Sequence, residues 1–205
     1  GPEMCIRDRC NEEGKVIAAG TIFKFSSTKF MLCCAVKIYN WLNDSAYGFD
    51  VSRSDVTDTS AALAIQGPTS CSTFKKFGAE DLEKLKPFEM REYKIDGFDI
   101  LISRTGFTGD LGYELWTDPK NAEATWDNIE IAGKELKLRP FGMHALEMTR
   151  IEAGFIQTNT DFMAAEDSLR PTRMRSPYEL GMGWLVHLNK NSYFVGKKAL
   201  KKEKE

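Results

Sequence analysis

The chain has 205 residues, of which 42% are hydrophobic and 11% aromatic, so it can bury a core without disulfides or a structural metal. Its 28 basic and 30 acidic residues give a net charge of −2, which argues against a nucleic-acid-binding protein. No stretch approaches the ~20 consecutive apolar residues of a membrane span, and no signal peptide is recognisable. The five cysteines are odd in number and irregularly spaced, which predicts a reducing, cytoplasmic compartment.

The two ends of the chain are interpreted separately from its fold. Gly1-Pro2 is typical of the pair left when a protease removes a purification tag, and residues 4–9 resemble a translated sequencing adapter. We therefore exclude residues 1–10 from the prediction of the fold. At the other end, the lysine-rich run 197–205 could bind anions, but a solvated final helical turn is the simpler interpretation.

Three strand-like and two helix-like stretches are predicted in the first part of the chain. The strands are predicted over residues 15–25, 29–35 and 60–66, and the helices over residues 36–46 and 69–77. The first two strands are joined by a serine- and threonine-rich turn and should form a hairpin. Thr69 and Ser70 supply the side chains that commonly cap a helix, so we expect them to begin the second helix.

The second part of the chain shows the same mixture of elements. Strands are predicted over residues 88–96, 98–104 and 113–117, and helices over residues 119–136 and 142–153. Asp96-Gly97 is a strong hairpin signal between two of these strands. The strands come in antiparallel-looking pairs with helices inserted between them, which indicates an α+β fold with antiparallel sheets.

Metal and thiol chemistry find little support in the residue pattern. The two histidines, His144 and His187, are far apart, and adjacent strand residues such as Cys33 and Cys34 point to opposite faces of a sheet. We therefore predict no metal site and interpret both cysteines as small core residues. Cys71 falls in the first turn of a predicted helix, where a thiol pKa is lowered, but no partner base is visible.

A glycine-rich stretch, S-R-T-G-F-T-G-D-L-G-Y-E-L-W over residues 103–116, is the most informative part of the sequence. A dinucleotide-binding loop would need a helix to begin after Gly112. The alternating, aromatic run that follows Gly112 predicts a strand instead, so the loop joins strand to strand. A nucleotide-dependent oxidoreductase stays as an alternative that requires the helix.

Glu114 lies in this run and shares a strand face with Trp116. A carboxylate beside an aromatic ring suits a flat heterocycle with an amidine-like edge, such as a pterin, because two parallel N–H···O bonds orient the ring. The alternative is an exposed glutamate on a sheet edge.

Four segments resemble, in the same order, the T-protein (aminomethyltransferase) of the glycine cleavage system and its tetrahydrofolate-dependent relatives. They are Ala62–Pro68 (A-L-A-I-Q-G-P), Ser103–Leu115 (S-R-T-G-F-T-G-D-L-G-Y-E-L), Met148–Gly154 (M-T-R-I-E-A-G) and Ser176–Leu200 (S-P-Y-E-L-G-M-G-W-L-V…F-V-G-K-K-A-L). Members of this family fold as three subdomains in a ring that holds folate. The resemblance implies that this chain is the central part of the ring, truncated at both ends.

The same resemblance implies a division of the chain. Residues 11–58 would be a remnant of the first folate-binding subdomain, residues 59–175 the second, α+β subdomain, and residues 176–205 a return to the first. The C-terminal β-barrel of the family would be absent.

Site residues are carried over from the family's motifs. The pterin-binding glutamate falls on Glu114 and the ring-stacking aromatic on Phe107. Arg150 could reach the folate, although an ion pair within the domain or a helix cap is an alternative. A basic loop could meet the carboxylates of the folate tail or be simply solvated, and its arginines are Arg170, Arg173 and Arg175.

The sequence also departs from the family pattern. Ala18 and Ala19 stand where family members carry Asp-Asp, so no catalytic residue is assigned. Leu146-Glu147 stands where many members carry Arg-Asp. The resemblance implies a tetrahydrofolate-dependent aminomethyl or methyl transferase, and these departures argue against true aminomethyl transfer.

The partners implied by the resemblance are tetrahydrofolate and a one-carbon donor, either a small molecule or a lipoyl carrier protein. We expect weak or no turnover by the 205-residue chain itself. A non-catalytic folate-binding or assembly module is a further alternative.

Overall fold

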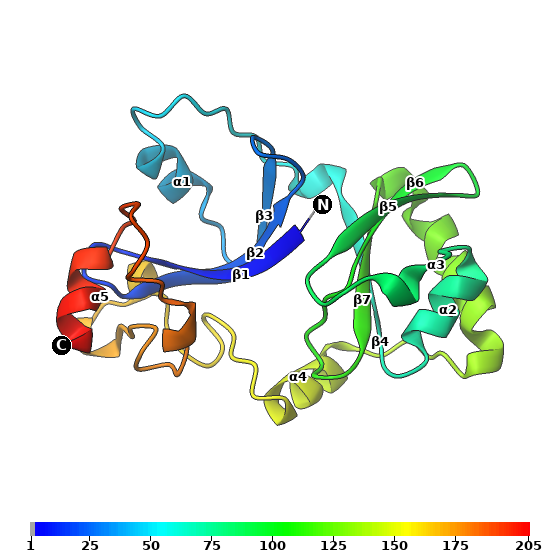
Figure 1. Cartoon of the computed structure of the whole chain (residues 1–205). Helices are drawn as coiled ribbons and strands as arrows, with labels where there is room; N and C mark the ends of the chain where they lie inside the picture. Colours follow the sequence, from blue (N-terminus) through cyan, green and yellow to red (C-terminus); the bar gives the residue numbers. More distant parts are fainter. Residues whose placement is uncertain (1–2) are drawn as a thin grey trace. The chain divides into compact units, whose positions relative to one another are not determined.

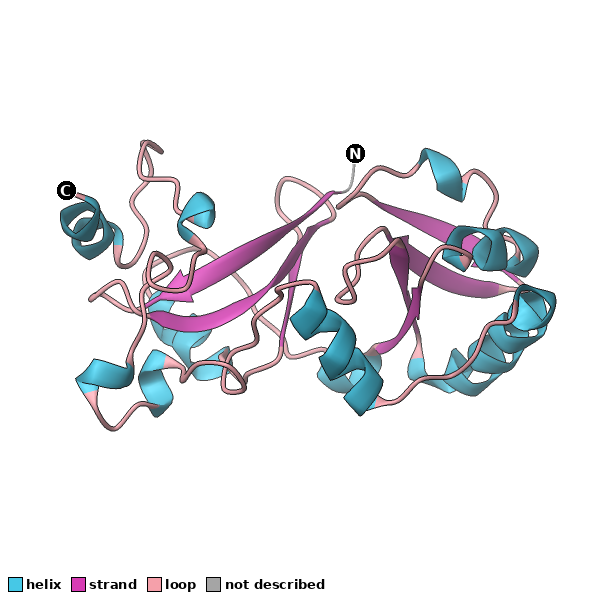
Figure 2. Ribbon diagram, turned by 90° about the horizontal axis from the view of Figure 1, so that it is seen from below, coloured by secondary structure: helices cyan, strands magenta, loops and turns pink. Residues whose placement is uncertain are grey.

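Residues 3–205 are described here from a computed structural model, in which the chain forms two compact units. Residues 52–155 form one of them, which we call the inserted unit. Residues 4–51 and 156–205 together form the other, which we call the split unit. Each unit has its own antiparallel sheet, and the strands of both are drawn in Figure 2.

The inserted unit is a four-stranded antiparallel sheet covered on one face by two helices. The strands are β4 (Ala61–Gln66), β5 (Met90–Ile95), β6 (Phe98–Ser103) and β7 (Gly112–Thr117), in the order β4-β7-β6-β5. Helices α2 (Ser70–Phe77) and α3 (Ala122–Gly133) lie side by side against the sheet (Figure 1). A further helix, α4 (Met143–Glu152), follows α3. The prediction of an α+β fold with antiparallel sheets and inserted helices is confirmed.

The core of the inserted unit lies between the sheet and the two helices. Alternate strand residues point into it, and the ring of Tyr113 on β7 meets the ring of Phe74 on α2 edge-on at 5.8 Å between centroids. Because strand side chains alternate, the residues between these core positions lie on the opposite face of the sheet, which α2 and α3 leave uncovered. Glu114 is one of them.

The β5–β6 hairpin follows the sequence prediction in detail. Ile95 pairs with Phe98, so the loop has two residues. Both of them, Asp96 and Gly97, have positive φ angles of 52° and 82°. Positive φ at both loop positions is the signature of the type I′ turn, which matches the twist of the flanking strands.

The helix predictions need three corrections. Helix α1 (Tyr39–Ser45) begins later than the predicted residue 36, because Val36 and Ile38 pack into the core beside β2 and β3. The Thr69 side chain makes no capping bond to α2; its carbonyl instead accepts from Thr73 Oγ1 at 3.1 Å. The predicted helix 119–136 is regular only over α3, with 3₁₀ turns on both sides.

The split unit is built on a three-stranded sheet in the order β1-β2-β3. Its strands are β1 (Glu3–Cys10), β2 (Val16–Lys24) and β3 (Phe30–Cys34). Residues 3–10, which the sequence led us to leave out of the fold, thus form a strand beside β2. The foreign origin of that segment stays a prediction. Short 3₁₀ helices complete the secondary structure of both units: Thr57–Thr59, Leu82–Lys84, Pro119–Asn121, Lys134–Leu136, Ala165–Asp167, Pro171–Arg173 and Gly183–Leu185.

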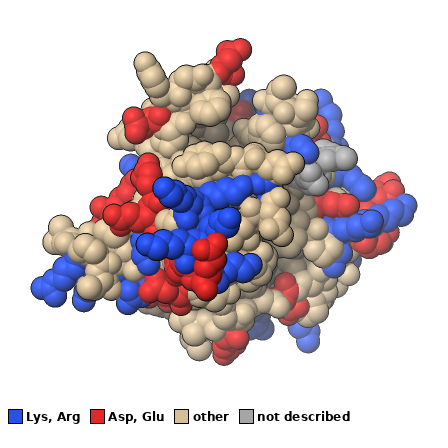
Figure 3. All heavy atoms as spheres, turned by 60° about the vertical axis from the view of Figure 1, so that its left-hand side comes forward, with Lys and Arg blue, Asp and Glu red and all other residues tan. Residues whose placement is uncertain are grey.

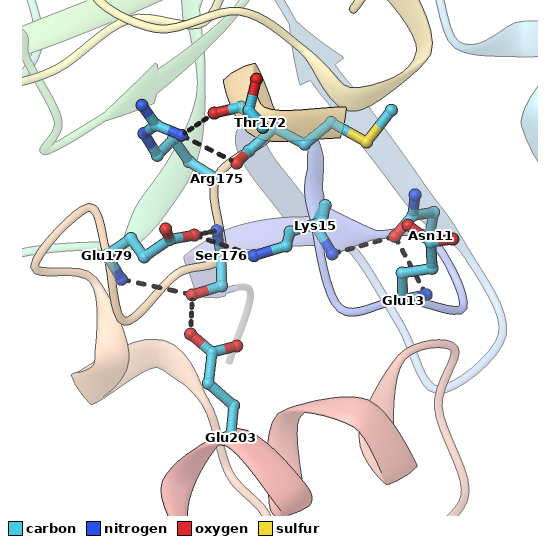
Figure 4. Close-up of polar contacts among 9 residues, drawn as sticks. Asn11, Glu13, Lys15, Thr172, Arg175, Ser176, Glu179 and Glu203 are labelled. Atoms are coloured by element: carbon cyan, nitrogen blue, oxygen red, sulfur yellow. Dashed lines mark hydrogen bonds and ion pairs between the residues drawn. The ribbon is translucent and has the colours of Figure 1, made fainter. Parts of the chain in front are cut away.

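Ser176 joins the second half of the split unit to the first (Figure 4). Its backbone N–H donates to Glu179 Oε2 at 2.7 Å, and its Oγ accepts from the Glu179 N–H at 3.3 Å. This reciprocal pair is a capping box. Glu179 also pairs with Lys15, whose Nζ lies 2.9 Å from Oε2, and the Ser176 hydroxyl donates to Glu203. Ser176 therefore links the start of β2 to the C-terminal helix.

The C-terminal helix α5 (Lys197–Lys204) agrees with the simpler interpretation of the basic run. Leu200 is 1% exposed and packs against Cys10 and Val16, while residues 201–205 are all exposed. Figure 3 turns forward the side of the molecule on which Figure 1 draws α5, and basic side chains are mixed with acidic ones on this face. The other lysines of α5 are exposed, whereas Lys197 is half-buried and its Nζ donates to the Ser192 carbonyl at 3.2 Å; the buried Leu200 anchors the helix.

Candidate functional site

Glu114 lies at the centre of the uncovered face of the inserted unit. Strand β7 runs between β4 and β6, so Glu114 has Ala64 on one side and Ser103 on the other. Its neighbours along the strand, Tyr113 and Leu115, are buried in the core under the helices. The strand alternation therefore projects the carboxylate away from the core, as the sequence predicts.

The carboxylate is half-buried and held by a short chain of hydroxyl groups. Thr105 Oγ1 donates to Glu114 Oε2 at 2.6 Å, and Ser103 Oγ lies 2.8 Å from Thr105 Oγ1. Since the Thr105 proton is used on Glu114, Ser103 is the donor of the second bond. Among the described residues, the other carboxylate oxygen, Oε1, has no hydrogen-bond partner. One oxygen is fixed and the other is available.

Burial raises the pKa of Glu114 above its ordinary value, and the hydrogen bond from Thr105 acts against that rise. Partial removal from water disfavours the charged form, whereas a donor to the carboxylate favours it. The group is thus more dependent on hydrogen-bond partners than an exposed glutamate is. An incoming N–H donor would offset part of the cost of its burial.

Small side chains flank Glu114 on the side of β4. Ala62 and Ala64 are both exposed, and Ala62 lies opposite Trp116 in the same register. Trp116 is half-buried and shares the face with Glu114. Glu114 thus has small methyl side chains beside it on β4 and an indole two residues along its own strand.

Gln66 organises the glycine loop and was missed by the sequence reasoning. Its Nε2 donates to the carbonyls of Tyr113 at 3.2 Å and Thr105 at 3.4 Å, and its Oε1 accepts from Thr108 Oγ1 at 3.2 Å. A Cβ atom at Gly106 or Gly112 would lie 1.9 Å from Gln66 Oε1. The two glycines are therefore required by close approach of this amide. The sequence signal that could have identified this role is the presence of Gln66 within the first family-like segment, Ala62–Pro68.

Phe107 does not lie free on the loop. Its ring stacks on the ring of Phe155, with 5.4 Å between centroids and 13° between planes. Both rings are partly exposed, so the pair forms an aromatic platform at the edge of the inserted unit. The role of Phe107 in stacking on a cofactor stays a prediction.

Arg150 lies inside the protein, 1% exposed, on the last turn of α4. Its Nε and Nη2 donate to Glu147 Oε2, the former at 3.0 Å, and its Nη1 donates to the Phe155 carbonyl at 2.9 Å. The ion pair that the sequence offered as an alternative is therefore present. Glu147, one of the two departures from the family's Arg-Asp pair, supplies its carboxylate.

Ala18 and Ala19, the positions of the missing carboxylates, lie on β2 in the split unit. Ala18 is fully buried and packs with Ile17 and Ala165, whereas Ala19 is half-buried and donates its N–H to Thr158 Oγ1 at 3.4 Å. A methyl group cannot accept or donate a proton at either position. No catalytic residue is assigned there.

The other candidate residues carry less chemistry. Within residues 3–205, no group of three or more histidine, cysteine, aspartate or glutamate side chains could hold a metal ion among those described. Cys33 is exposed, so its interpretation as a core residue is wrong; it lies on β3, an edge strand of its sheet. Cys34 is half-buried and donates to the Val36 carbonyl at 3.1 Å. Cys71 packs against the core of the inserted unit; burial, and after it the neighbouring Cys71 thiol, raises the pKa of Tyr113 to about 12.

Two further expectations meet different outcomes. Arg175 is turned back onto its own loop, where Nη1 donates to the carbonyls of Thr172 at 2.8 Å and Met174 at 3.1 Å, while Arg170 and Arg173 are exposed. The helix that a nucleotide-binding loop requires after Gly112 is not formed, because β7 begins there. In the described part of the chain, none of the helices combines the length and apolar character needed to span a membrane.

Comparisons with known proteins show which family the chain resembles. A family model described as the GCVT N-terminal domain matches residues 8–190. Aminomethyltransferases of Thermotoga maritima and Clostridium botulinum (strain Loch Maree) are 33% and 35% identical to the chain over 200 residues, covering 96% and 95% of it. These regions are 52% of each relative, so the chain spans about half the length of the curated relatives it matches.

A solved structure shares the fold. The glycine cleavage system aminomethyltransferase T from Bartonella henselae superimposes with a TM-score of 0.78 and 20% identity, over 98% of this chain and 52% of that one. The family model covers most of the chain, and the four segments singled out in the sequence lie wholly or largely within the matched region. The chain therefore belongs to the GCVT N-terminal domain family of the glycine cleavage T-proteins.

Proposed function

We propose that this chain forms the tetrahydrofolate-binding part of a one-carbon transferase. Glu114 would bind the amidine-like edge of the pterin, Thr105 would hold the carboxylate in place, and Phe107 would pack on the ring. When bound, tetrahydrofolate supplies the N5 amine that accepts the one-carbon unit. The protein's own contribution is to orient the ring and exclude water, since alignment alone can supply up to ~7–11 kcal/mol of a barrier.

One observation supports the proposal above the others. Glu114 is half-buried, one carboxylate oxygen is fixed by Thr105 at 2.6 Å, and the other has no partner among the described residues. An exposed glutamate on a sheet edge would need neither burial nor a fixed rotamer. A planar donor edge would satisfy the open oxygen and share the fixed one, which has a second lone pair.

We propose further that the parent protein transfers a group other than the aminomethyl unit. Ala18 and Ala19 replace the paired carboxylates of the family pattern, and Ala18 is buried in an apolar cluster. A methyl or methylene donor that needs less proton transfer fits such a site better. The donor would be a small molecule or a lipoyl carrier protein.

Binding of 5-formyltetrahydrofolate to the 205-residue chain tests the cofactor assignment. At 100 times the dissociation constant, the ligand should raise the free energy of unfolding by ~2.7 kcal/mol. Glu114→Gln should abolish most of that gain, because an amide offers one acceptor in place of two. Glu92→Gln is the matched control, since Glu92 is an exposed glutamate on β5 of the same sheet. Equal stabilisation of both variants would overturn the assignment.

Turnover with an aminomethyl donor can overturn the proposal about the transferred group. The chain should transfer little or nothing to tetrahydrofolate from an aminomethyl-loaded lipoyl carrier protein, and this can be followed by the formation of methylenetetrahydrofolate. Rapid transfer from that donor would contradict the proposal that the parent protein is not an aminomethyltransferase.

A further inference from the structure

The turn after α4 holds Phe155 in a defined place. Gly154 has a φ angle of 76°, its N–H donates to the Ile151 carbonyl at 3.0 Å, and the Phe155 N–H donates to the Arg150 carbonyl at 2.9 Å. These two bonds form a Schellman motif, the common C-terminal end of a helix. Phe155 therefore begins from a fixed backbone position.

Arg150 adds a second bond to the same residue. Its guanidinium Nη1 donates to the Phe155 carbonyl at 2.9 Å, while its backbone carbonyl accepts from the Phe155 N–H. The guanidinium itself is kept in place by Glu147 through Nε and Nη2. Both polar groups of the Phe155 backbone are thus bound by one residue, which is 1% exposed. A helix end needs the first bond but not the second.

The turn that Arg150 holds also contacts the glycine loop. The Phe155 ring stacks on Phe107 at 5.4 Å between centroids. A Cβ atom added at Gly109 would lie 2.5 Å from the Ala153 side chain, so the loop backbone touches the turn at a second point. The same loop carries Thr105, which donates to Glu114. A chain of contacts therefore runs from Glu147 to the loop that faces the carboxylate.

We propose that Arg150 is a positioning residue for the ligand site: it sets the place of Phe107 through Phe155 and does not itself touch the ligand. This inference rests on the proposed function, because it gives Phe107 a ligand to pack on. Arg150 is 1% exposed, so direct contact with a ligand would require its side chain to leave its buried place beside Glu147 and Phe155, and moving a buried arginine away from its partners is costly.

The experiment has one arm without ligand and one with it. In the first arm, hydrogen exchange of the amides of residues 105–109 is compared between the unaltered chain and Arg150→Met. Loss of the Arg150 bond to the Phe155 carbonyl should speed the exchange of these loop amides by about tenfold or more. The amides of the β5–β6 hairpin should stay unchanged and serve as an internal reference. Equal exchange in the loop would overturn the positioning role.

In the second arm, calorimetry measures the dissociation constant of 5-formyltetrahydrofolate in a double-mutant cycle. Arg150→Met should raise the dissociation constant by about tenfold in the unaltered chain. In a chain that carries Phe107→Leu, it should raise the constant by less than about twofold. Additive losses would show that Arg150 acts on the ligand without Phe107, and this would overturn the proposal. Glu147→Gln, which keeps the side-chain shape, serves as the milder variant should Arg150→Met fold poorly.

The two arms keep the failures apart. Absence of binding by the unaltered chain would overturn the proposed function and, with it, the role of Arg150 toward the ligand. The exchange arm would still decide whether Arg150 orders the loop. Rapid loop exchange with unchanged ligand affinity would reduce Arg150 to a structural residue.

Discussion

Ser103 lies directly opposite Glu114 in the β6–β7 pairing, and Thr105, two residues further along, donates to the Glu114 carboxylate. The chain leaves β6 at Ser103, so the donor comes from the first residues of the glycine loop and not from the sheet. The position of the carboxylate thus depends on the loop as well as on the strand.

Removing the Thr105 hydroxyl should destabilise the folded chain. Thr105→Val keeps the shape of the side chain but leaves Glu114 Oε2 without its donor, at a cost of about 1–3 kcal/mol for a bond to a charged group. Urea denaturation at neutral pH measures the loss. Thr57→Val is the matched control, because Thr57 donates to Asp55 at the same 2.6 Å but both residues are exposed. It should change the free energy of unfolding by less than about 0.5 kcal/mol.

Glu114→Gln should change the pH dependence of stability in a defined direction. Burial raises the pKa of Glu114 in the folded chain, so the folded state binds the proton more readily than the unfolded state. The contribution of Glu114 to the free energy of unfolding therefore falls as pH rises from the unfolded to the folded pKa. As pH rises through this range, the free energy of unfolding of the variant should increase relative to that of the unaltered chain. The two values should be most similar at acidic pH.

Glu179→Gln should show the opposite trend in the same urea denaturation series. Lys15 and the Ser176 N–H lower the pKa of Glu179, so its stabilising contribution is present above the unfolded pKa and disappears as pH falls through the folded one. The variant should be less stable than the unaltered chain at neutral pH and approach it in acid. Difference curves with the same slope for the Glu114 and Glu179 variants would contradict one of the two assignments, and flat curves would contradict both.

Gly112→Ala should be costly because of Gln66 and not because of the backbone. An added Cβ would lie 1.9 Å from Gln66 Oε1, so the amide must move and give up its bonds to Thr108 and the loop carbonyls. Overpacking of this kind costs about 1–3 kcal/mol. In a Gln66→Ala background, thermal denaturation should register a much smaller loss. Gly142→Ala is the control, since an added Cβ there meets nothing within 4 Å.

Ser176→Ala should loosen the C-terminal helix. The variant loses the side-chain half of the capping box and the bond to Glu203, which together should cost about 1–2 kcal/mol. Hydrogen exchange in α5 should rise along with the loss of thermal stability. Ser192→Ala, at an exposed loop serine, should leave both measurements unchanged.

Helix α3 illustrates where the periodic pattern was insufficient. The helical spacing of Ala122, Trp126, Ile129 and Leu136 predicts that these four residues share one apolar stripe, but Trp126 is 45% exposed. The buried stripe instead follows Thr125, Ile129 and Gly133, at intervals of four residues. The Leu138 side chain folds back onto the helix, so that a Cβ atom added at Gly133 would lie only 2.5 Å from it. The packing of the segment after α3 therefore decided which face of the helix is buried.

The sequence by itself determined the local elements and the family. Strand alternation placed Glu114 on the sheet face away from the core, and Asp96-Gly97 set the turn of the β5–β6 hairpin. The sequence motifs identified the family. Tertiary structure alone decided which distant groups meet: Gln66 reaches the Thr105 carbonyl across 39 residues of chain. Periodicity reports which face of an element is apolar, because hydrophobic burial is not directional. Hydrogen bonds and ring stacking are directional, so their partners are set only when the folded backbone brings the groups together.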